Sequence, residues 1–421
     1  MVPRPHKSRA LQAQRLQHVN IAAKATSGRF RADLPNEVAR RLDGMFPHRG
    51  ANIALHEPEF NNQAETLVLD CLRSTYVSSV GEYVQDFETE LAAACGVKHA
   101  VAMVNGTAAL EVALRVVGVE PGSEVLLPSL TFVATANAVS HLNAVPHFVD
   151  VEDRSLGIDS DALVRHLKKV GRQTGGRLFN KETGRRISAI IPVHVFGHPV
   201  AMDDLNAVAN TFDLPVIEDA AEALGSQYKQ KRCGSLGSAG AFSFNGNKII
   251  TTGGGGAVVT NDSRIADLAR HLSSTAKLVH PWEFEHDSVG YNYRMPNLNA
   301  ALGVSQLMDL ATRIASKRIL AAAYESAFSD QDGLRVLTEP SYATSNYWLN
   351  AIILDSAAVD CRDAVLARLH KLGFMARPIW KPMHKQVMYA DAPRAKLPIT
   401  EDLAGRIINL PSSAHLKDLL Q

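Results

Sequence analysis

Short apolar runs alternate with alanine-rich amphipathic runs along most of this chain, from about residue 52 onward. The apolar runs are rich in Val, Ile and Leu and end at polar or turn-forming residues, as buried strands do. Strands are predicted at residues 99–104, 124–127, 146–149, 189–193 and 214–217, and helices at residues 108–117 and 131–142. This alternation predicts a largely parallel sheet that is covered by helices on both faces.

The pattern changes after Pro296, where a long helix is predicted from residue 298 to residue 318 or beyond. A strand at 347–353 and a helix at 362–372 then indicate a smaller C-terminal α/β domain. We expect an N-terminal extension (1–51), a large domain (52–296) and a small C-terminal domain (297–421). The polar, glycine-rich residues 171–186 predict an exposed excursion, and residues 34–45 predict a short helix.

Length and composition indicate a soluble globular protein. The chain has 421 residues, enough for two hydrophobic cores, with 46% hydrophobic and 21% charged residues. Its formal net charge of +1 provides no global field for nucleic acid or for an anionic membrane. Because no apolar run approaches the roughly 20 residues of a membrane span, no membrane partner is expected.

The four cysteines are scattered and form no CxxC pair, so neither a metal site nor a disulfide framework is predicted. A reducing cytoplasm is the expected location. The first 49 residues are basic but lack the apolar segment and cleavage site of a secretory signal. A solvated extension is favoured there over a nucleic-acid-binding arm.

Lys248 lies in the run Ser243-Phe-Asn-Gly-Asn-Lys248, just before a glycine-rich turn. A lysine there can hold an aldehyde cofactor as an imine, and a serine hydroxyl and glycine backbone can hold a phosphate. From this segment alone, a surface lysine before a flexible loop is an equal alternative.

Two further polar signals lie where predicted strands end. Asn105-Gly106-Thr107 opens a helix, so its N–H groups and the Thr107 hydroxyl predict an anion site, although a simple helix cap also explains them. Asp219 follows an apolar strand and could pair with a protonated ring nitrogen or merely cap a helix. An electron-sink cofactor needs this set: a lysine, an acid and phosphate donors.

Six segments in order resemble the DegT/DnrJ/EryC1/StrS sugar aminotransferases, which are pyridoxal-phosphate enzymes. They are Asn105-Gly-Thr, Pro128-Ser-Leu-Thr-Phe, His194-Val-Phe-Gly, Glu218-Asp-Ala-Ala-Glu, Ser243-Phe-Asn-Gly-Asn-Lys and Asn292-Tyr-Arg-Met. The resemblance runs from about residue 52 to near the C-terminus. It implies the PLP-dependent transferase fold, of the aspartate aminotransferase type.

The resemblance also implies a role for each matching residue. Lys248 would form the imine with pyridoxal 5'-phosphate, Asp219 would pair with the pyridine nitrogen, and Phe132 would stack on the ring. The phosphate would be held by Gly106, Thr107 and Ser243. Glu222 occupies a cofactor-side position that is often Gln or His in the family, which leaves its role open. Asn292 matches the position through which a partner subunit reaches the phosphate, so a homodimer with shared active sites is implied. His194 ends a predicted strand, where it can satisfy backbone groups, so a structural role is favoured over a catalytic one.

Family members that remove a hydroxyl group carry histidine where this chain has Lys248. Since histidine cannot form the imine, transamination is favoured. Residues 345–350 and 377–384 resemble the LegC/PglE-type branch, which implies L-glutamate as donor and a UDP-linked 2-acetamido-4-keto-6-deoxy sugar as acceptor, with amination at C4. Trp348, Arg377 and His384 are candidate substrate contacts that could equally be packing residues. A PLP-dependent sugar dehydratase or lyase and a non-catalytic PLP-binding regulator remain as alternatives.

Overall fold

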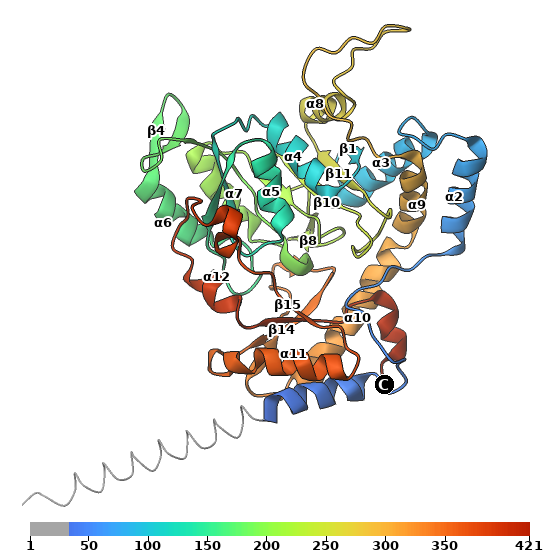
Figure 1. Ribbon diagram of the computed structural model, residues 1–421, viewed down its shortest axis with the longest axis vertical. Coiled ribbons are helices and arrows are strands. Elements are labelled where there is room, and N and C mark those ends of the chain that lie inside the picture. The colour runs from blue at the N-terminus through green and yellow to red at the C-terminus, as the bar shows by residue number, and fades with distance from the viewer. Residues whose placement is uncertain (1–32) are drawn as a thin grey trace, which may run out of the picture.

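The computed structural model describes residues 33–421 and places one large sheet above a smaller, C-terminal sheet (Figure 1). The large sheet has the order β1-β11-β10-β7-β6-β2-β3, because isolated bridges between Ile190 and Val216 and between Val193 and Asp219 join its two halves. Its strands are β1 (His99–Met103), β2 (Glu124–Pro128), β3 (Val145–Val149), β6 (Arg186–Ile190), β7 (Ile217–Asp219), β10 (Ala239–Ser243) and β11 (Gly256–Thr260).

The large sheet is mostly parallel, as the alternating pattern predicted. Strand β11 is antiparallel to both β1 and β10, whereas β10 is parallel to β7, and β2 is parallel to β3 and β6. The parallel strands therefore end at one edge of the sheet. In open α/β sheets, ligands bind at this edge.

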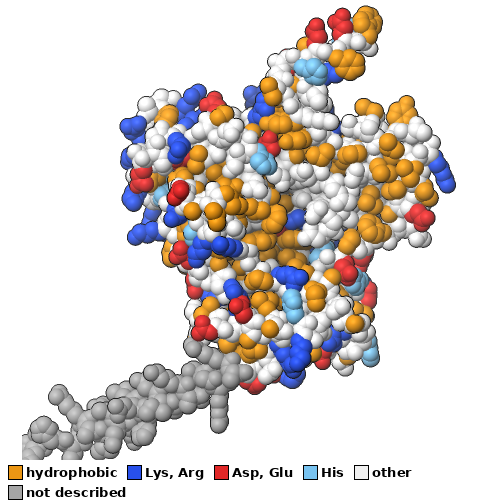
Figure 2. Space-filling view, viewed as in Figure 1, with side chains coloured by type: hydrophobic (Ala, Val, Ile, Leu, Met, Phe, Trp, Pro, Cys, Tyr) orange, Lys and Arg blue, Asp and Glu red, His pale blue; other side chains and the backbone are white. Residues whose placement is uncertain are grey.

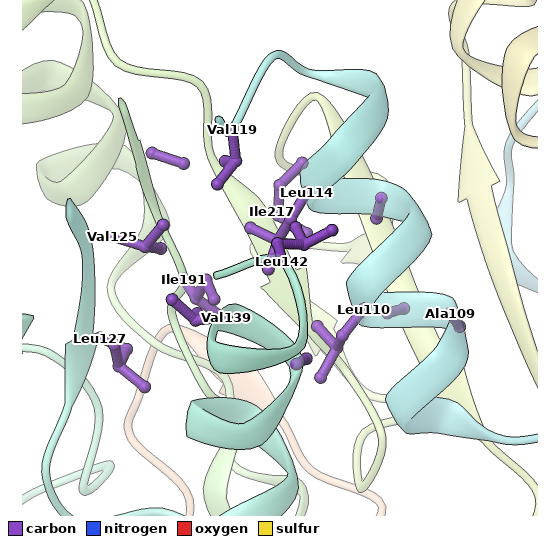
Figure 3. Packing of buried hydrophobic residues seen from close by; sticks show 14 of the residues in the cluster. Ala109, Leu110, Leu114, Val119, Val125, Leu127, Val139, Leu142, Ile191 and Ile217 are labelled. Carbon is purple, nitrogen blue, oxygen red and sulfur yellow. The ribbon is translucent and has the colours of Figure 1, made fainter. Parts of the chain in front are cut away.

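Helices with alanine-rich apolar faces cover this sheet. They are α4 (Gly106–Val116), α5 (Val133–His141), α6 (Ser160–Val170), α7 (Met202–Phe212) and α8 (Ser263–Ser273). Figure 3 shows Leu110 and Leu114 of α4 directed toward Val139 of α5 and Ile217 of β7, and all four belong to one buried cluster. This packing fixes the start of α4 and the end of β7, which both reach the parallel-strand edge.

The polar residues 171–186, predicted to be an exposed excursion, form a hairpin that pairs with the first residues of β6. Strand β4 (Gly171–Thr174) is antiparallel to β5 (Arg177–Asn180), which in turn pairs with β6. Three of the four residues of β4 are exposed, as predicted for the whole segment. A separate small sheet combines β8 (Gln227–Tyr228), β9 (Lys231–Arg232) and β13 (Ala343–Thr344).

The single long helix predicted from residue 298 is divided in two. Helix α9 (Asn297–Met308) packs on α2 (Asn62–Ser74) and α3 (Glu82–Cys95), and α10 (Leu310–Phe328) leads to the C-terminal sheet. The break falls at Asp309, where the N–H bonds to the carbonyl of Gln306, and where Oδ2 accepts from Nδ2 of Asn61 at 2.6 Å. A one-residue break of this kind leaves no clear trace in apolar spacing.

The C-terminal sheet has the order β12-β14-β16-β15 and is antiparallel. Its strands are β12 (Leu334–Val336), β14 (Asn350–Leu354), β15 (Arg377–Pro378) and β16 (Ile407–Leu410), with helices α11 (Arg362–Lys371) and α12 (Pro398–Leu403). Short 3-10 helices are η1 (Val195–Gly197), η2 (Ser356–Cys361), η3 (Met383–Lys385), η4 (Val387–Tyr389) and η5 (Ala414–Leu419). The predicted strand at 347–353 and helix at 362–372 thus correspond to β14 and α11.

The short helix predicted at 34–45 is present as a helix at residues 33–45. The expectation that this region is solvated is wrong for residues 34–46. Leu34, Val38, Leu42 and Phe46 recur every four residues and are buried in the cluster that also contains Tyr324 of α10. Residues 1–32, which hold much of the basic extension, lie outside the described part of the chain.

None of the helices in residues 33–421 combines the length and the apolar character that crossing a membrane requires.

Candidate active site

One cavity of about 280 Å³ lies at the carboxyl edge of the large sheet, where the C-terminal part of the chain also reaches it. It brings together eight of the eleven site residues that the sequence predicted. They are Gly106, Thr107, Phe132, Asp219, Glu222, Ser243, Lys248 and Trp348. Five separate segments contribute these side chains, so the convergence is a property of the fold.

Asp219 lies at the end of β7, opposite Ala241 of β10 in parallel register. Its carboxylate is buried and oriented: Oδ2 accepts from the hydroxyl of Thr135 at 2.7 Å, and Oδ1 accepts from the N–H of Ala221 at 3.2 Å. Burial raises the pKa of Asp219, and the hydrogen bond from Thr135 opposes that effect. A cationic partner inside the cavity would offset the desolvation of this carboxylate.

Thr135 is a site residue that the sequence analysis missed. It lies one turn after Thr131 on α5, and the two hydroxyls are 2.8 Å apart. Thr131 precedes α5, and two hydroxyl residues four positions apart at a helix start are the signal that could have revealed the pair. Thr135 thereby connects α5 to the acid of β7.

The β1–α4 turn forms an anion cradle. Asn105 is the N-cap, with its side chain accepting from the N–H of Ala108 at 2.8 Å. The N–H groups of the first turn have no acceptor within the helix, so this end attracts negative charge. A Cβ on Gly106 would lie 2.7 Å from the Cβ of Ser243, so only glycine lets β10 come this close.

Lys248 has its amine inside the cavity and is only slightly exposed. Nζ lies 3.3 Å from Oε1 of Glu222 and 3.8 Å from the centroid of the Trp348 ring. The ring is fixed by a hydrogen bond from its Nε1 to the carbonyl of Asn247 at 2.6 Å. The amine is therefore held between a carboxylate and an aromatic face.

Glu222 is fully buried against the same cavity. Its Oε2 accepts from the N–H of Phe196 at 2.8 Å, and Phe196 itself adopts a left-handed conformation with φ of 56°. Burial raises the pKa of Glu222, while Lys248 opposes that effect. The side chain thus brings a carboxylate to the amine of Lys248.

His194 has the surroundings of a structural residue. Its Nδ1 accepts from the N–H of Val200 at 3.2 Å, and its Nε2 lies 2.9 Å from Glu218. Both oxygens of Glu218 also accept backbone N–H groups, from Gly234 and from residues 236 and 237. The pair anchors the loop after β9 beneath β7 and keeps no lone pair directed into the cavity.

Aromatic rings close the side of the cavity that faces the C-terminal sheet. Phe132 is half exposed, and its ring centroid lies 6.2 Å from that of Trp380. Trp380 also lies 5.3 Å from Phe196, and Phe196 lies 6.5 Å from Trp348. Phe132 thus has a free face, as stacking on a planar ligand requires.

Three predicted site residues do not line the cavity. Asn292 is exposed and forms a bridge with Ser274. Arg377 is exposed on β15, where Nη1 lies 2.9 Å from a ring nitrogen of His370. His384 is buried, and its Nδ1 lies 2.7 Å from the hydroxyl of Ser129. Of the three substrate contacts predicted in the C-terminal part, only Trp348 lines the cavity.

The cavity fits the predicted cofactor. A buried acid faces the place of a protonated ring nitrogen, an amine lies within reach of an aldehyde, and the cradle where a Cβ would collide with Ser243 suits a phosphate. The chemistry of these residues therefore matches that of pyridoxal 5'-phosphate.

Comparison with known proteins agrees with this chemistry. The model of the DegT/DnrJ/EryC1/StrS aminotransferase family matches residues 58–419. GDP-perosamine synthase of Caulobacter vibrioides is 37% identical over 369 residues, which cover 87% of this chain and 94% of that protein. The UDP-N-acetyl-3-dehydro-alpha-D-glucosamine 3-aminotransferase of Acidithiobacillus ferrooxidans is 32% identical over 362 residues, covering 82% and 91%.

Solved structures share the fold. The aminotransferase PseC of Helicobacter pylori, which is involved in the biosynthesis of pseudoaminic acid, matches with a TM-score of 0.79 at 28% identity. The match covers 87% of this chain and 95% of that one. The predicted fold class, cofactor and family are thus confirmed. The chain belongs to the DegT/DnrJ/EryC1/StrS aminotransferase family, and it is an enzyme that depends on pyridoxal phosphate.

Proposed function

We propose that this enzyme transfers an amino group from L-glutamate to C4 of a nucleotide-linked 4-keto-6-deoxy sugar. The observation that carries the proposal is the position of Lys248, whose amine shares one cavity with Asp219 and with the anion cradle at Gly106. The sugar acceptor is supported by relatives whose names specify GDP-perosamine and a UDP-linked amino sugar. The segments at 345–350 and 377–384 favour a UDP-linked 2-acetamido sugar.

Each residue has a task that its surroundings support. The bound cofactor supplies an aldehyde and an electron sink. Lys248 would hold the cofactor through its amine, and that amine, when free, would be the group that moves a proton at the donor's α-carbon. Asp219, oriented by Thr135, would pair with the ring nitrogen and favour its protonated form. Glu222 accepts from Nζ of Lys248 at 3.3 Å and would orient that amine.

The aromatic side of the cavity supports the sugar site. Trp380 and Phe132 lie at its mouth, and planar rings of this kind stack on sugar faces or on a base. The amine of Lys248 lines the same cavity and would move a proton at C4 of the bound sugar. Arg377 and His384 lie outside the cavity wall, so we no longer assign them contact with the reacting end of the sugar.

We also propose a homodimer in which Asn292 serves the partner's phosphate. Asn292 ends a segment that exposes large apolar side chains, among them Val279, Trp282, Phe284 and Val289. Exposed apolar surface of this kind marks association sites. A cytoplasmic location is proposed because Cys71, Cys95 and Cys233 are buried thiols that form no disulfide.

An absorbance titration tests the proposal directly. L-Glutamate is added to cofactor-loaded enzyme and removed, and then UDP-2-acetamido-4-keto-6-deoxyglucose or its GDP-linked 4-keto-6-deoxy counterpart is added. We expect the cofactor band to disappear with glutamate and to return with one of the two sugars. Lys248→Ala should show neither change.

The outcomes separate the alternatives. A band that disappears with glutamate but returns with neither sugar would overturn the acceptor class and leave the amino donor intact. A product that has lost a hydroxyl group without consuming glutamate would indicate a dehydratase. Folded protein that binds the cofactor without any effect of glutamate would contradict the donor and favour a regulator.

A further inference from the structure

A second cavity, of about 740 Å³, lies between α6 and the segment 394–399, at the end of β3. It shares no lining residue with the active-site cavity. One wall carries Arg165 and Lys169 from α6, and the other carries Arg394 and Lys396. A cavity of this size is in the range that holds small-molecule ligands, roughly 300–1,000 Å³.

The four cations of this cavity have no carboxylate partner. Nearby Arg185 and Arg186 each lie within 4.0 Å of a glutamate, whereas within residues 33–421 no Asp or Glu oxygen lies that close to any of the four lining cations. Arg394 makes only a hydrogen bond from Nη1 to the carbonyl of Ala390, at 2.8 Å. The four cations are therefore free of close ion pairs, and they exceed by one the three carboxylates of the lining, Asp150, Asp159 and Glu182.

The acids in the wall are already engaged. Asp150 accepts the N–H groups of Ile399 and Thr400 at 3.1 and 2.8 Å, which begins α12, and Asp159 caps α6 by accepting from Ala162 at 2.8 Å. Each carboxylate is thus committed to a helix start. Glu182 is the remaining acid of the lining.

The surroundings strengthen the field. Residues 165–186 contain eight Lys or Arg and one Glu, although the whole chain has a net charge of only +1. Figure 2 shows Lys and Arg side chains gathered over the end of the molecule that carries α6 and β4. Clustering of one sign beside a concave wall focuses the potential and attracts anions.

His166 adds a fixed wall without adding charge. Its Nε2 lies 2.8 Å from Nε2 of His147, and His147 in turn contacts Glu124 through Nδ1 at 2.8 Å. Burial, together with His147, lowers the pKa of His166 to about 4, so the ring is neutral near pH 7. The charge available to a ligand thus comes from the four Lys and Arg side chains.

We propose that this cavity binds a small anion that carries a diphosphate group. Each wall offers one arginine, which contacts phosphate oxygens in a bidentate manner, and one lysine, which acts as a point charge. Two such walls match two linked phosphoryl groups better than one isolated phosphate. The inference is independent of the function proposed above, because no active-site residue takes part.

Calorimetric titration with inorganic pyrophosphate tests this site. The cofactor-loaded wild-type enzyme is used at low ionic strength, so that the cofactor's phosphate fills the cradle at Gly106. We expect saturable binding that R394Q/K396Q weakens by about tenfold or more, given the strength of charge-assisted hydrogen bonds. The double variant K168Q/R172Q removes the same charge from the same patch but leaves the cavity lining intact, and it should bind within about twofold of wild type.

Further arms identify the source of the diphosphate. UDP and GDP are titrated into wild type and into R394Q/K396Q. If a nucleotide binds wild type more tightly than pyrophosphate does, and the variant loses this binding, the ligand is a nucleoside diphosphate. If the nucleotides bind wild type only as tightly as pyrophosphate does, the ligand is a free diphosphate. Absence of saturable pyrophosphate binding would overturn the proposal. Equal weakening of pyrophosphate binding by both double variants would also overturn it, because that result would indicate a diffuse basic surface. So would a full chain that binds anionic vesicles but none of the soluble diphosphates.

Discussion

At the scale of single residues, Glu222 places a carboxylate beside the amine of Lys248. Its carboxylate lies 3.3 Å from Nζ of Lys248 and accepts from Phe196, so Glu222→Gln keeps the shape and removes the charge. We expect kcat to fall by about 100-fold, the lower end of proton-transfer contributions. Steady-state kinetics with glutamate and the ketosugar measure this.

The pH profile distinguishes charge from shape at Glu222. Burial raises the pKa of Glu222, so the wild-type rate should fall as the pH drops through that raised value and the carboxylate is neutralised. Glu222→Gln has no such group and should lose this acidic limb. Glu222→Asp restores the charge and should recover part of the rate. An unchanged acidic limb in Glu222→Gln would contradict the assignment.

Lys317 is a second residue with an unusual charge environment. It is fully buried on α10 and donates to the carbonyl of Ser412, and burial lowers its pKa to about 7. In the unfolded chain the pKa of a lysine is about 10.4, so between this pKa and that of buried Lys317 the unfolded state binds more protons than the folded state. The free energy of unfolding should therefore rise by up to about 1.4 kcal/mol for each pH unit in this range. This stability is absent below about pH 7 and complete above about pH 10.

Denaturant titrations at pH 7.5 and pH 9 test this linkage. Lys317→Met should lose the rise that wild type shows, whereas Lys371→Met, at an exposed lysine of α11, should keep it. Equal slopes in wild type and Lys317→Met would show that other groups cause the pH dependence.

At the scale of elements, the start of α4 depends on a close approach to β10. Gly106→Ala would place a Cβ 2.7 Å from that of Ser243, so the two elements must separate, and overpacking of this kind costs about 1–3 kcal/mol. We expect the affinity for pyridoxal phosphate to fall about tenfold or more. Fluorescence titration of the cofactor-free enzyme measures it.

Gly246→Ala is the matched control for this approach. A Cβ at Gly246 meets no atom within 4 Å, so this variant should bind the cofactor like wild type although it lies in the lysine loop. If Gly106→Ala also binds pyridoxal phosphate as tightly as wild type, cofactor binding does not depend on the close approach of α4 to β10.

The sequence predicted the elements better than their ends. Apolar runs of period two and four set the strands and helices of the large sheet, and residues at their ends gave Asp219, Lys248 and Thr107. The break at Asp309 escaped because one hydrogen bond from Asn61, distant in sequence, determines it. Thr135 of α5 escaped for a similar reason, since its partner Asp219 lies on β7, 84 residues later in the chain.

At the scale of the whole molecule, the active site combines residues from two distant parts of the chain. The large sheet supplies Lys248 and Asp219, and the chain after residue 340 supplies Trp348 and Trp380. The buried cluster beneath the C-terminal sheet includes residues from the helix at 33–45, nearly 300 residues earlier in the chain than α10. Composition alone favoured a solvated extension there, because basic residues before residue 33 obscured the apolar positions that follow.

This arrangement predicts that the N-terminal helix stabilises the part of the enzyme that carries the tryptophans. Phe46 is fully buried, with its ring 6.3 Å from that of Tyr324 and 6.1 Å from that of Phe374. Phe46→Ala should therefore lower the free energy of unfolding by about 3–5 kcal/mol, as measured by denaturant titration. Val387→Ala, at a position that is 92% exposed, should change it by less than about 0.5 kcal/mol. A loss below about 1 kcal/mol for Phe46→Ala would mean that the C-terminal core is stable without the helix.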